Sequence, residues 1–183
     1  GSGNTATATQ VITVEDKQNP TITAPAAKTV SADAGSCTAS NVSLGTPTTG
    51  DNCSVASVTN NAPTTFPLGT TTVIWKVTDG SGNTATANQV ITVEDKQNPT
   101  ITAPAAKTVS ADAGSCTASN VSLGTPTTGD NCSVASVTNN APTTFPLGTT
   151  TVTWKVTDGS GNTATATQVI TVEDKQNPTI TAP

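Results

Sequence analysis

Residues 70–93 read TTTVIWKVTDGSGNTATANQVITV, which describes two β-strands joined by a tight turn. Val73, Trp75 and Val77 occupy alternate positions, so their side chains are expected on one face of the first strand. The turn from Asp79 to Asn83 is rich in residues that tolerate positive φ, as hairpin turns require. The closing strand, with a bulge near Gln89, places these residues on one face: Ala85, Ala87, Gln89, Ile91 and Val93. The stretch therefore predicts a long hairpin with one apolar face.

Shorter extended segments precede this hairpin in the chain. Strands are expected at 21–23, 28–31, 37–44 and 55–59, with a polar loop at 45–52 and an irregular connection at 60–69 that turns Phe66, Pro67 and Leu68 inward. Threonine makes up roughly a fifth of the residues, well above ordinary usage. Threonine and valine favour strands, while the 14 Gly and 12 Pro favour turns. About seven short strands around one Trp predict an all-β fold, a β-sandwich of immunoglobulin-like type.

The whole pattern occurs more than once. The segment GSGNTATA begins at Gly1, Gly80 and Gly159, which gives a period of 79 residues. We expect complete repeats at 16–94 and 95–173, arranged as beads on a string, with 1–15 ending a preceding repeat and 174–183 starting the next. Two internal substitutions fall on outward faces: Ile74 against Thr153, and Asn88 against Thr9 and Thr167. Copies this similar favour a spacer or polymer within a longer array.

Composition excludes several classes of function. The chain contains no His, Tyr, Met or Arg, and its net charge is −5 with 10% charged residues. Without His, neither a Ser–His nor a Cys–His pair can form, and too few aromatic residues remain to build a sugar cleft, so we predict no enzyme and no catalytic residue. The scarcity of Lys argues against nucleic acid. No apolar run approaches the roughly 18 residues of a membrane span, so no membrane insertion is expected in this segment.

Each repeat contains two cysteines sixteen residues apart, Cys37 with Cys53 and Cys116 with Cys132. Two thiols without His are too few for a structural zinc site, which uses four ligands. We therefore favour a disulfide within each repeat, where closing a loop of about 16 residues contributes about 3 kcal/mol to a small domain. A pair of buried free thiols is the alternative. Disulfides predict a secreted protein in an oxidising, extracellular or cell-surface setting.

Oxygen-bearing side chains are expected at one pole of each repeat. In an immunoglobulin-like topology the start of the first strand, one loop and the final hairpin turn meet there, and Ca²⁺ prefers oxygen ligands. No cofactor is required, but the sequence predicts calcium at the junctions between repeats. The candidate ligands are Glu15, Asp16, Asp33, Asp51, Asp79 and Asn83, and, in the next copy, Glu94, Asp95, Asp130, Asp158 and Asn162. The alternative is that these are ordinary turn and capping residues.

Four segments carry a family resemblance: DKQNPTITAP, TGDNC, FPLGTTTVIWKVTDGSGNTATA and QVITV. Together they resemble the HYR (hyalin repeat) domain over the whole period, and FPLGTTTV followed by TDGSGN is the most specific part. The resemblance implies an immunoglobulin-like fold, an extracellular location, an adhesive or scaffolding role, and no catalysis. Many members carry a second cysteine pair, but here Ala24 precedes Pro25 and the closing strand has no cysteine. The absence of both partners supports pairing of Cys37 with Cys53.

Two functions remain after these exclusions. The first is a structural shaft or spacer of a long extracellular filament or adhesin, with self-association of several chains side by side into a homo-oligomer. Long arrays of near-identical copies resemble the giant adhesins and surface filaments of gliding bacteria, such as hook filaments. The second is an adhesive module in which each repeat binds a cell-surface or carbohydrate ligand. Binding surfaces are typically rich in aromatic residues, which here make up 2% of the chain, so the sequence favours the shaft.

Overall fold

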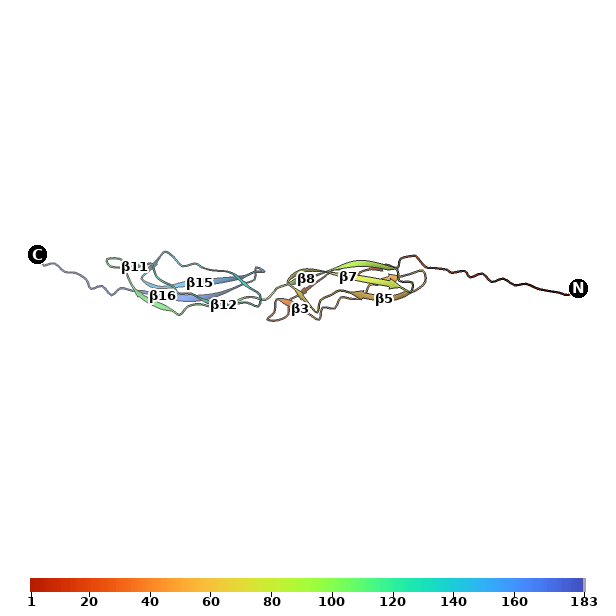
Figure 1. Cartoon of the computed structure of the whole chain (residues 1–183). Coiled ribbons are helices and arrows are strands. Elements are labelled where there is room, and N and C mark those ends of the chain that lie inside the picture. Colours follow the sequence, from red (N-terminus) through yellow and green to blue (C-terminus); the bar gives the residue numbers. More distant parts are fainter. Residues whose placement is uncertain (183) are drawn as a thin grey trace. The chain divides into compact units, whose positions relative to one another are not determined.

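The structure is a computed structural model that describes residues 1–182, all as strands, turns and loops. The first repeat contains strands β1 to β8, of which Figure 1 labels β3, β5, β7 and β8. They are β1 (Thr21–Thr23), β2 (Lys28–Ser31), β3 (Thr38–Ser40), β4 (Thr48–Gly50), β5 (Val55–Asn60), β6 (Thr65–Pro67), β7 (Gly69–Asp79) and β8 (Thr84–Glu94). The long hairpin predicted from residues 70–93 is thus present as β7 and β8.

The second repeat forms the same eight strands. They are β9 (Thr100–Thr102), β10 (Lys107–Ser110), β11 (Thr117–Ser119), β12 (Thr127–Gly129), β13 (Val134–Asn139), β14 (Thr144–Pro146), β15 (Gly148–Asp158) and β16 (Thr163–Glu173). Each repeat has one four-stranded sheet, in the order β2-β8-β7-β5 or β10-β16-β15-β13. Two short antiparallel pairs complete each repeat, β1 with β4 and β3 with β6, or β9 with β12 and β11 with β14.

The long hairpin carries most of the core. Its inward positions alternate with exposed ones, as the period of two in a strand requires. In the second repeat, Val152 and Trp154 of β15 pack with Ala118 of β11 and Phe145 of β14 in one buried cluster that also contains Ile170 and Val172. The core therefore lies between the four-stranded sheet and the short pairs. This arrangement makes the fold an all-β, tandem immunoglobulin-like β-sandwich.

Contacts between residues divide the chain into two compact units. Unit 1 contains Gly1–Thr29, Asn41–Phe66 and Thr70–Thr92. Unit 2 contains Val30–Ser40, Pro67–Gly69 and the residues from Val93 onward. The boundary between the units thus differs from the boundary between the sequence repeats, because residues 30–40 group with the second repeat.

Several short strands differ from the sequence prediction. The strand expected at 37–44 is limited to β3, since Asn41 adopts a left-handed backbone with φ of 52°. The expected loop at 45–52 contains β4, and the expected connection at 60–69 contains β6, where Phe66 is buried. The bulge near Gln89 is absent at the equivalent Gln168, whose strand keeps a regular register. The irregularities lie instead in β5 and β13.

Candidate metal centre and inter-repeat disulfide

Three aspartates of unit 1 converge, as the sequence analysis expected. Asp16 precedes β1, Asp51 follows β4, and Asp79 ends β7. Each offers a carboxylate oxygen, and these oxygens all lie within 4.8 Å of one another. The convergence arises because the start of β1, the loop after β4 and the β7–β8 turn meet at one end of the sandwich.

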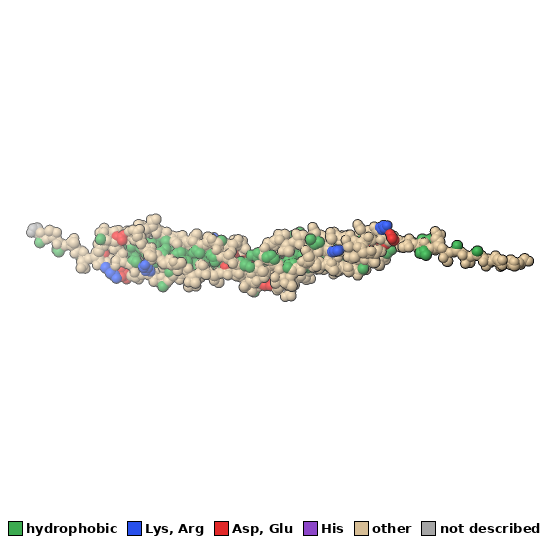
Figure 2. Space-filling model, viewed as in Figure 1, with side chains coloured by type: hydrophobic (Ala, Val, Ile, Leu, Met, Phe, Trp, Pro, Cys, Tyr) green, Lys and Arg blue, Asp and Glu red, His purple; other side chains and the backbone are tan. Residues whose placement is uncertain are grey.

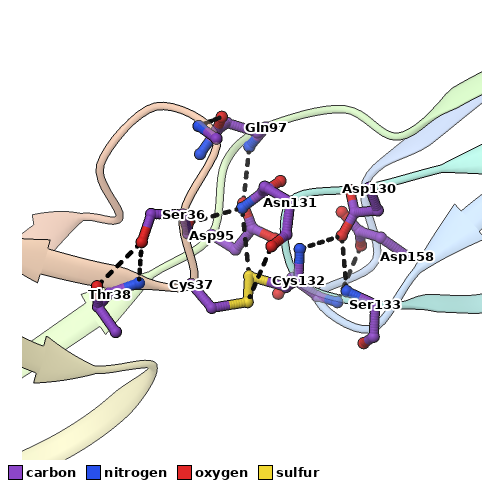
Figure 3. Close-up of a disulfide and its surroundings, with 12 residues drawn as sticks. Ser36, Cys37, Thr38, Asp95, Gln97, Asp130, Asn131, Cys132, Ser133 and Asp158 are labelled. Carbon is purple, nitrogen blue, oxygen red and sulfur yellow. Dashed lines mark hydrogen bonds between the residues drawn. A yellow bond between two sulfur atoms is a disulfide. The ribbon is translucent and has the colours of Figure 1, made fainter.

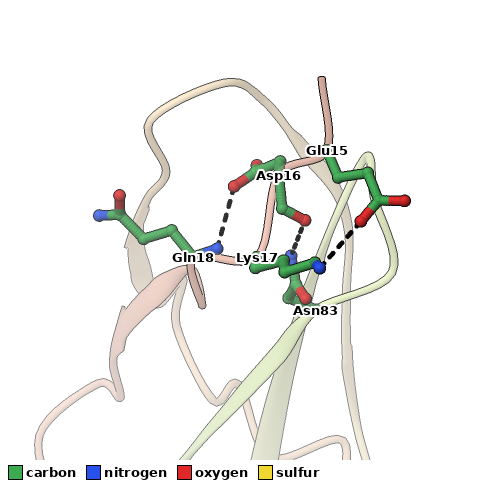
Figure 4. A network of polar contacts seen from close by, with 5 residues as sticks. All are labelled: Glu15, Asp16, Lys17, Gln18 and Asn83. Carbon is green, nitrogen blue, oxygen red and sulfur yellow. Dashed lines mark hydrogen bonds and ion pairs between the residues drawn. The ribbon is translucent and has the colours of Figure 1, made fainter. Parts of the chain in front are cut away.

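Hydrogen bonds reach both oxygens of Asp79 but only one oxygen each of Asp16 and Asp51. Asp16 Oδ1 accepts from the Gln18 backbone N–H at 3.0 Å, as drawn in Figure 4, and from the Asn52 side chain at 3.3 Å. Asp51 Oδ2 accepts from the backbone N–H groups of the two residues that follow Asn52, at 2.9 and 2.8 Å. The second oxygens, Asp16 Oδ2 and Asp51 Oδ1, are buried and accept no hydrogen bond.

Asp79 is the most buried of the three, with 2% of its surface exposed. Burial by itself raises the pKa of this carboxyl, but hydrogen bonds from Asn83, Ser81 and Gly82 outweigh burial and lower the pKa below its usual value. The same carboxylates act on the neighbouring thiol. Chiefly through its charge, Asp16 raises the pKa of Cys53, and burial adds to the effect. The cluster is therefore a region of negative potential.

Unit 2 contains a related cluster, in which oxygens of Asp95 and Asp130 and the sulfur of Cys132 all lie within 4.8 Å of one another. Asp95 is 6% exposed and Asp158 is 2% exposed. Asp95 Oδ2 and Asp130 Oδ1 are again buried without a hydrogen-bond partner. Asp158 accepts a hydrogen bond from the Asn162 side chain at 2.8 Å. As at Asp79, hydrogen bonds outweigh the effect of burial and lower the pKa of Asp158. The pair of buried, unsatisfied carboxylate oxygens thus recurs in the second repeat.

Several other predicted ligands lie outside the clusters. Glu15 pairs with Lys17 at 2.9 Å, as Figure 4 shows, and Glu94 pairs with Lys96 at 3.0 Å. Asp33 accepts two hydrogen bonds from Ser40 and so fixes its own turn. Asn83 and Asn162 direct their amide N–H groups, not their oxygens, toward the aspartates. These five residues are therefore not placed to act as primary side-chain ligands: Glu15, Asp33, Asn83, Glu94 and Asn162.

The disulfide joins two sequence repeats within unit 2. Cys37 is bonded to Cys132, 95 residues further along the chain, and their Cα atoms are 5.0 Å apart. Figure 3 shows the bond beside Asp95, Asn131 and Ser36. The Asn131 side chain donates to the Ser36 carbonyl at 2.9 Å and to Asp95 Oδ1 at 3.2 Å. Cys53 and Cys116 are free and exposed.

The predicted pairing of Cys37 with Cys53 and of Cys116 with Cys132 is therefore wrong in this structure. In the second repeat, Cys132 lies next to Ser133, whose carbonyl accepts from Gly159 in the turn before β16. Cys116 lies in a turn region near the other end of β16, where the Ala111 backbone N–H donates to the Glu173 carbonyl. An 11-residue strand spans roughly 35 Å, so two thiols near its opposite ends cannot bond.

Gln97 was missed by the sequence analysis. Its side-chain oxygen accepts from Gly35 N–H at 2.8 Å, and its side-chain amide donates to the Asp33 carbonyl at 3.0 Å. Gln176 makes the same contacts with Gly114 and Asp112. The signal was present in the repeated DKQNP run, but only spatial proximity identifies the partner of each side chain.

Comparison with known proteins finds the HYR domain in this chain twice, at residues 15–93 and 94–172. Hyalin of Strongylocentrotus purpuratus is 35% identical over the whole chain, which covers 16% of that protein. Hyalin of Lytechinus variegatus is 34% identical over 98% of the chain, which covers 36% of that protein. The chain thus spans well under half the length of these relatives.

Among solved structures, Drosophila N-cadherin EC1-4 matches 86% of this chain and 50% of its own, with 10% identity and a TM-score of 0.46. Protocadherin gamma C5 EC1-3 matches 85% of this chain and 68% of its own, with 12% identity and a TM-score of 0.43. No helix capable of spanning a bilayer occurs in the described residues.

Proposed function

The chain belongs to the HYR domain family, and we propose that it forms part of the structural shaft of a long extracellular filament or adhesin on a bacterial surface. The observation that carries the proposal is the Cys37–Cys132 disulfide, which bonds one repeat covalently to the next. A tensile element benefits from such a bond because force passes from one repeat to the other without unfolding the residues between the two cysteines.

The surface and the core support this assignment over a repeated ligand-binding module. All four aromatic residues of the chain, Phe66, Trp75, Phe145 and Trp154, are at most 6% exposed. None is therefore available to stack on a sugar or to anchor a protein ligand. Charged side chains are sparse on the face in Figure 2, where uncharged polar residues and backbone predominate. Such a surface suits a spacer.

The free cysteines extend the proposal to a longer array. Cys116 occupies the repeat position of Cys37, and Cys53 occupies that of Cys132. In a chain with further copies, Cys116 is expected to bond the following repeat and Cys53 the preceding one. Formation of each bond converts two thiols to a disulfide, while a disulfide oxidant such as glutathione disulfide accepts the two electrons and two protons and becomes two thiols. Every repeat would then be linked covalently to both neighbours.

Disulfide mapping of the oxidised, monomeric chain tests this pairing. After alkylation of free thiols, cleavage before Asp and after Lys places Cys53 in fragment 51–76 and Cys132 in fragment 130–155. These fragments differ in mass because one contains Ile74 and the other Thr153. We expect only the Thr153 fragment to be bonded to the DAGSCTASNVSLGTPTTG fragment, and the Ile74 fragment to be alkylated.

Two matched variants identify which copy of the shared fragment is bonded. Cys37→Ser should abolish the bond to fragment 130–155, whereas Cys116→Ser should leave it unchanged. Recovery of the Ile74 fragment in a disulfide, or loss of the bond only in Cys116→Ser, would show pairing within a repeat and remove the main support for the shaft.

Lateral association of several chains is a separate part of the proposal. Strand β5 lies at the edge of its sheet, and all six of its residues are exposed, so its backbone edge can pair with another chain. Mass per unit length of the native assembly, measured by electron microscopy with an internal mass standard, decides the question. Several chains per cross-section are expected, and a single chain would restrict the function to a single-molecule tether.

A further inference from the structure

We propose that each repeat binds one calcium ion, through Asp16, Asp51 and Asp79 in the first repeat and through Asp95, Asp130 and Asp158 in the second. The inference is independent of the shaft, since each site is built from residues of one compact unit. Its starting point is that the oxygens of the first three aspartates lie within 4.8 Å of one another. Two oxygens bonded to the same calcium ion at 2.3–2.6 Å can be separated by up to about 5 Å.

The unsatisfied oxygens distinguish these clusters from ordinary turns. A turn or cap explains the oxygens that accept backbone N–H groups, such as Asp51 Oδ2. It does not explain Asp95 Oδ2, which is buried without a hydrogen-bond partner on a side chain only 6% exposed. Buried polar atoms are nearly always paired, and a pair of unsatisfied carboxylate oxygens occurs in both repeats. A bound cation would supply the partner that these oxygens lack.

The charge balance points the same way. Three carboxylates lie together in the first repeat, and two lie beside Cys132 Sγ in the second, while within residues 1–182 the ion pairs join Lys only to Glu. No side-chain cation therefore offsets the repulsion between the aspartates. The hydrogen bonds from Asn83 to the Asp79 carboxylate and to the Asp16 carbonyl already hold two of the segments in place. The site is thus preorganised, and an ion would complete it without a large rearrangement.

The donor set favours calcium over other divalent ions. Carboxylate oxygens are hard ligands, which disfavours zinc and copper. In the second repeat the neighbouring sulfur of Cys132 is consumed in the disulfide, so there it cannot supply the thiolate that a soft metal prefers. Magnesium requires near-ideal octahedral geometry at about 2.1 Å, whereas calcium accepts an irregular shell completed by water.

Calorimetric titration of the complete, metal-free chain with CaCl2 tests the proposal. We expect two ions per chain, with MgCl2 binding at least tenfold more weakly. Asp51→Asn should reduce the stoichiometry to one, because the amide can keep the turn hydrogen bonds but replaces the unsatisfied oxygen by NH2. Asp51→Asn combined with Asp130→Asn should reduce it to zero. The control Asp33→Asn changes a carboxylate outside the clusters and should leave two ions bound.

Thermal unfolding provides a readout that does not depend on the titration. Calcium should raise the melting temperature of the wild type and of Asp33→Asn, but not that of the double variant. Without calcium, the double variant should melt above the wild type, since neutralising one aspartate per cluster removes repulsion. Absence of calcium binding at millimolar concentration, or two ions still bound by the double variant, would overturn the proposal.

Discussion

Gln89 shows how one buried polar side chain connects parts of the sandwich that are distant in sequence. It is 2% exposed on the inward face of β8. Its Oε1 accepts from the Trp75 indole at 3.1 Å, and its Nε2 donates to the carbonyls of Ala26 at 3.0 Å and Leu44 at 2.9 Å. Its position in an otherwise apolar row therefore reflects complete hydrogen bonding, not a bulge.

Replacing Gln89 by Leu should therefore destabilise the first repeat despite the added apolar surface. The change leaves the buried Trp75 N–H and the Leu44 carbonyl unpaired, and we expect a loss of about 2 kcal/mol in the free energy of unfolding. Urea denaturation followed by Trp fluorescence measures it. Asn88→Thr, the residue found at the equivalent position of the next copy, is the control and should change stability by less than about 0.5 kcal/mol. Equal stability of the two variants would contradict this role of Gln89.

At the scale of the element, the β7–β8 hairpin is the part that sequence describes best. Eleven residues of strict alternation identify each strand, and Val73, Trp75 and Val77 are buried as predicted. The short strands β4 and β6 were missed because three residues contain no readable period. Strand β4 is the polar TTG, and it is extended only because it pairs with β1, 29 residues away at Thr21 and Gly50.

Two adjacent positions of β7 test this alternation. Val73 is fully buried and Ile74 is 44% exposed. Val73→Thr keeps the shape but buries a hydroxyl in the core, and should cost about 2 kcal/mol. Ile74→Thr, which copies Thr153 of the second repeat, should cost less than about 0.5 kcal/mol. Both are measured by the shift of the urea midpoint, and similar costs at the two positions would show that the strand does not present one face to the core.

At the scale of the whole molecule, the disulfide determines how the chain responds to force. Residues between Cys37 and Cys132 are enclosed in a covalent loop of sequence separation 95. They cannot contribute to extension until the bond is reduced. The chain is therefore expected to extend differently under oxidising and reducing conditions, while its folded structure stays the same.

Single-molecule stretching of the chain measures this directly. Adding a reductant should release roughly 320 Å of additional contour length, given about 3.4 Å per extended residue. Cys37→Ser should show no dependence on reductant. Pairing within each repeat would instead give two releases of roughly 55 Å, and that result would contradict the disulfide described here.

The sequence alone determined the all-β class, the 79-residue repeat, the long hairpin and its inward face, because alternation and turn chemistry are local properties. It also named Asp16, Asp51 and Asp79, whose oxygens converge, among a wider set of candidate ligands, since the ends of neighbouring elements were expected to meet. Only the tertiary structure decided that Cys37 bonds Cys132 and that Asp95 keeps an unsatisfied buried oxygen. A disulfide partner depends on distance in space, and the thiol sixteen residues away lies toward the far end of a long strand.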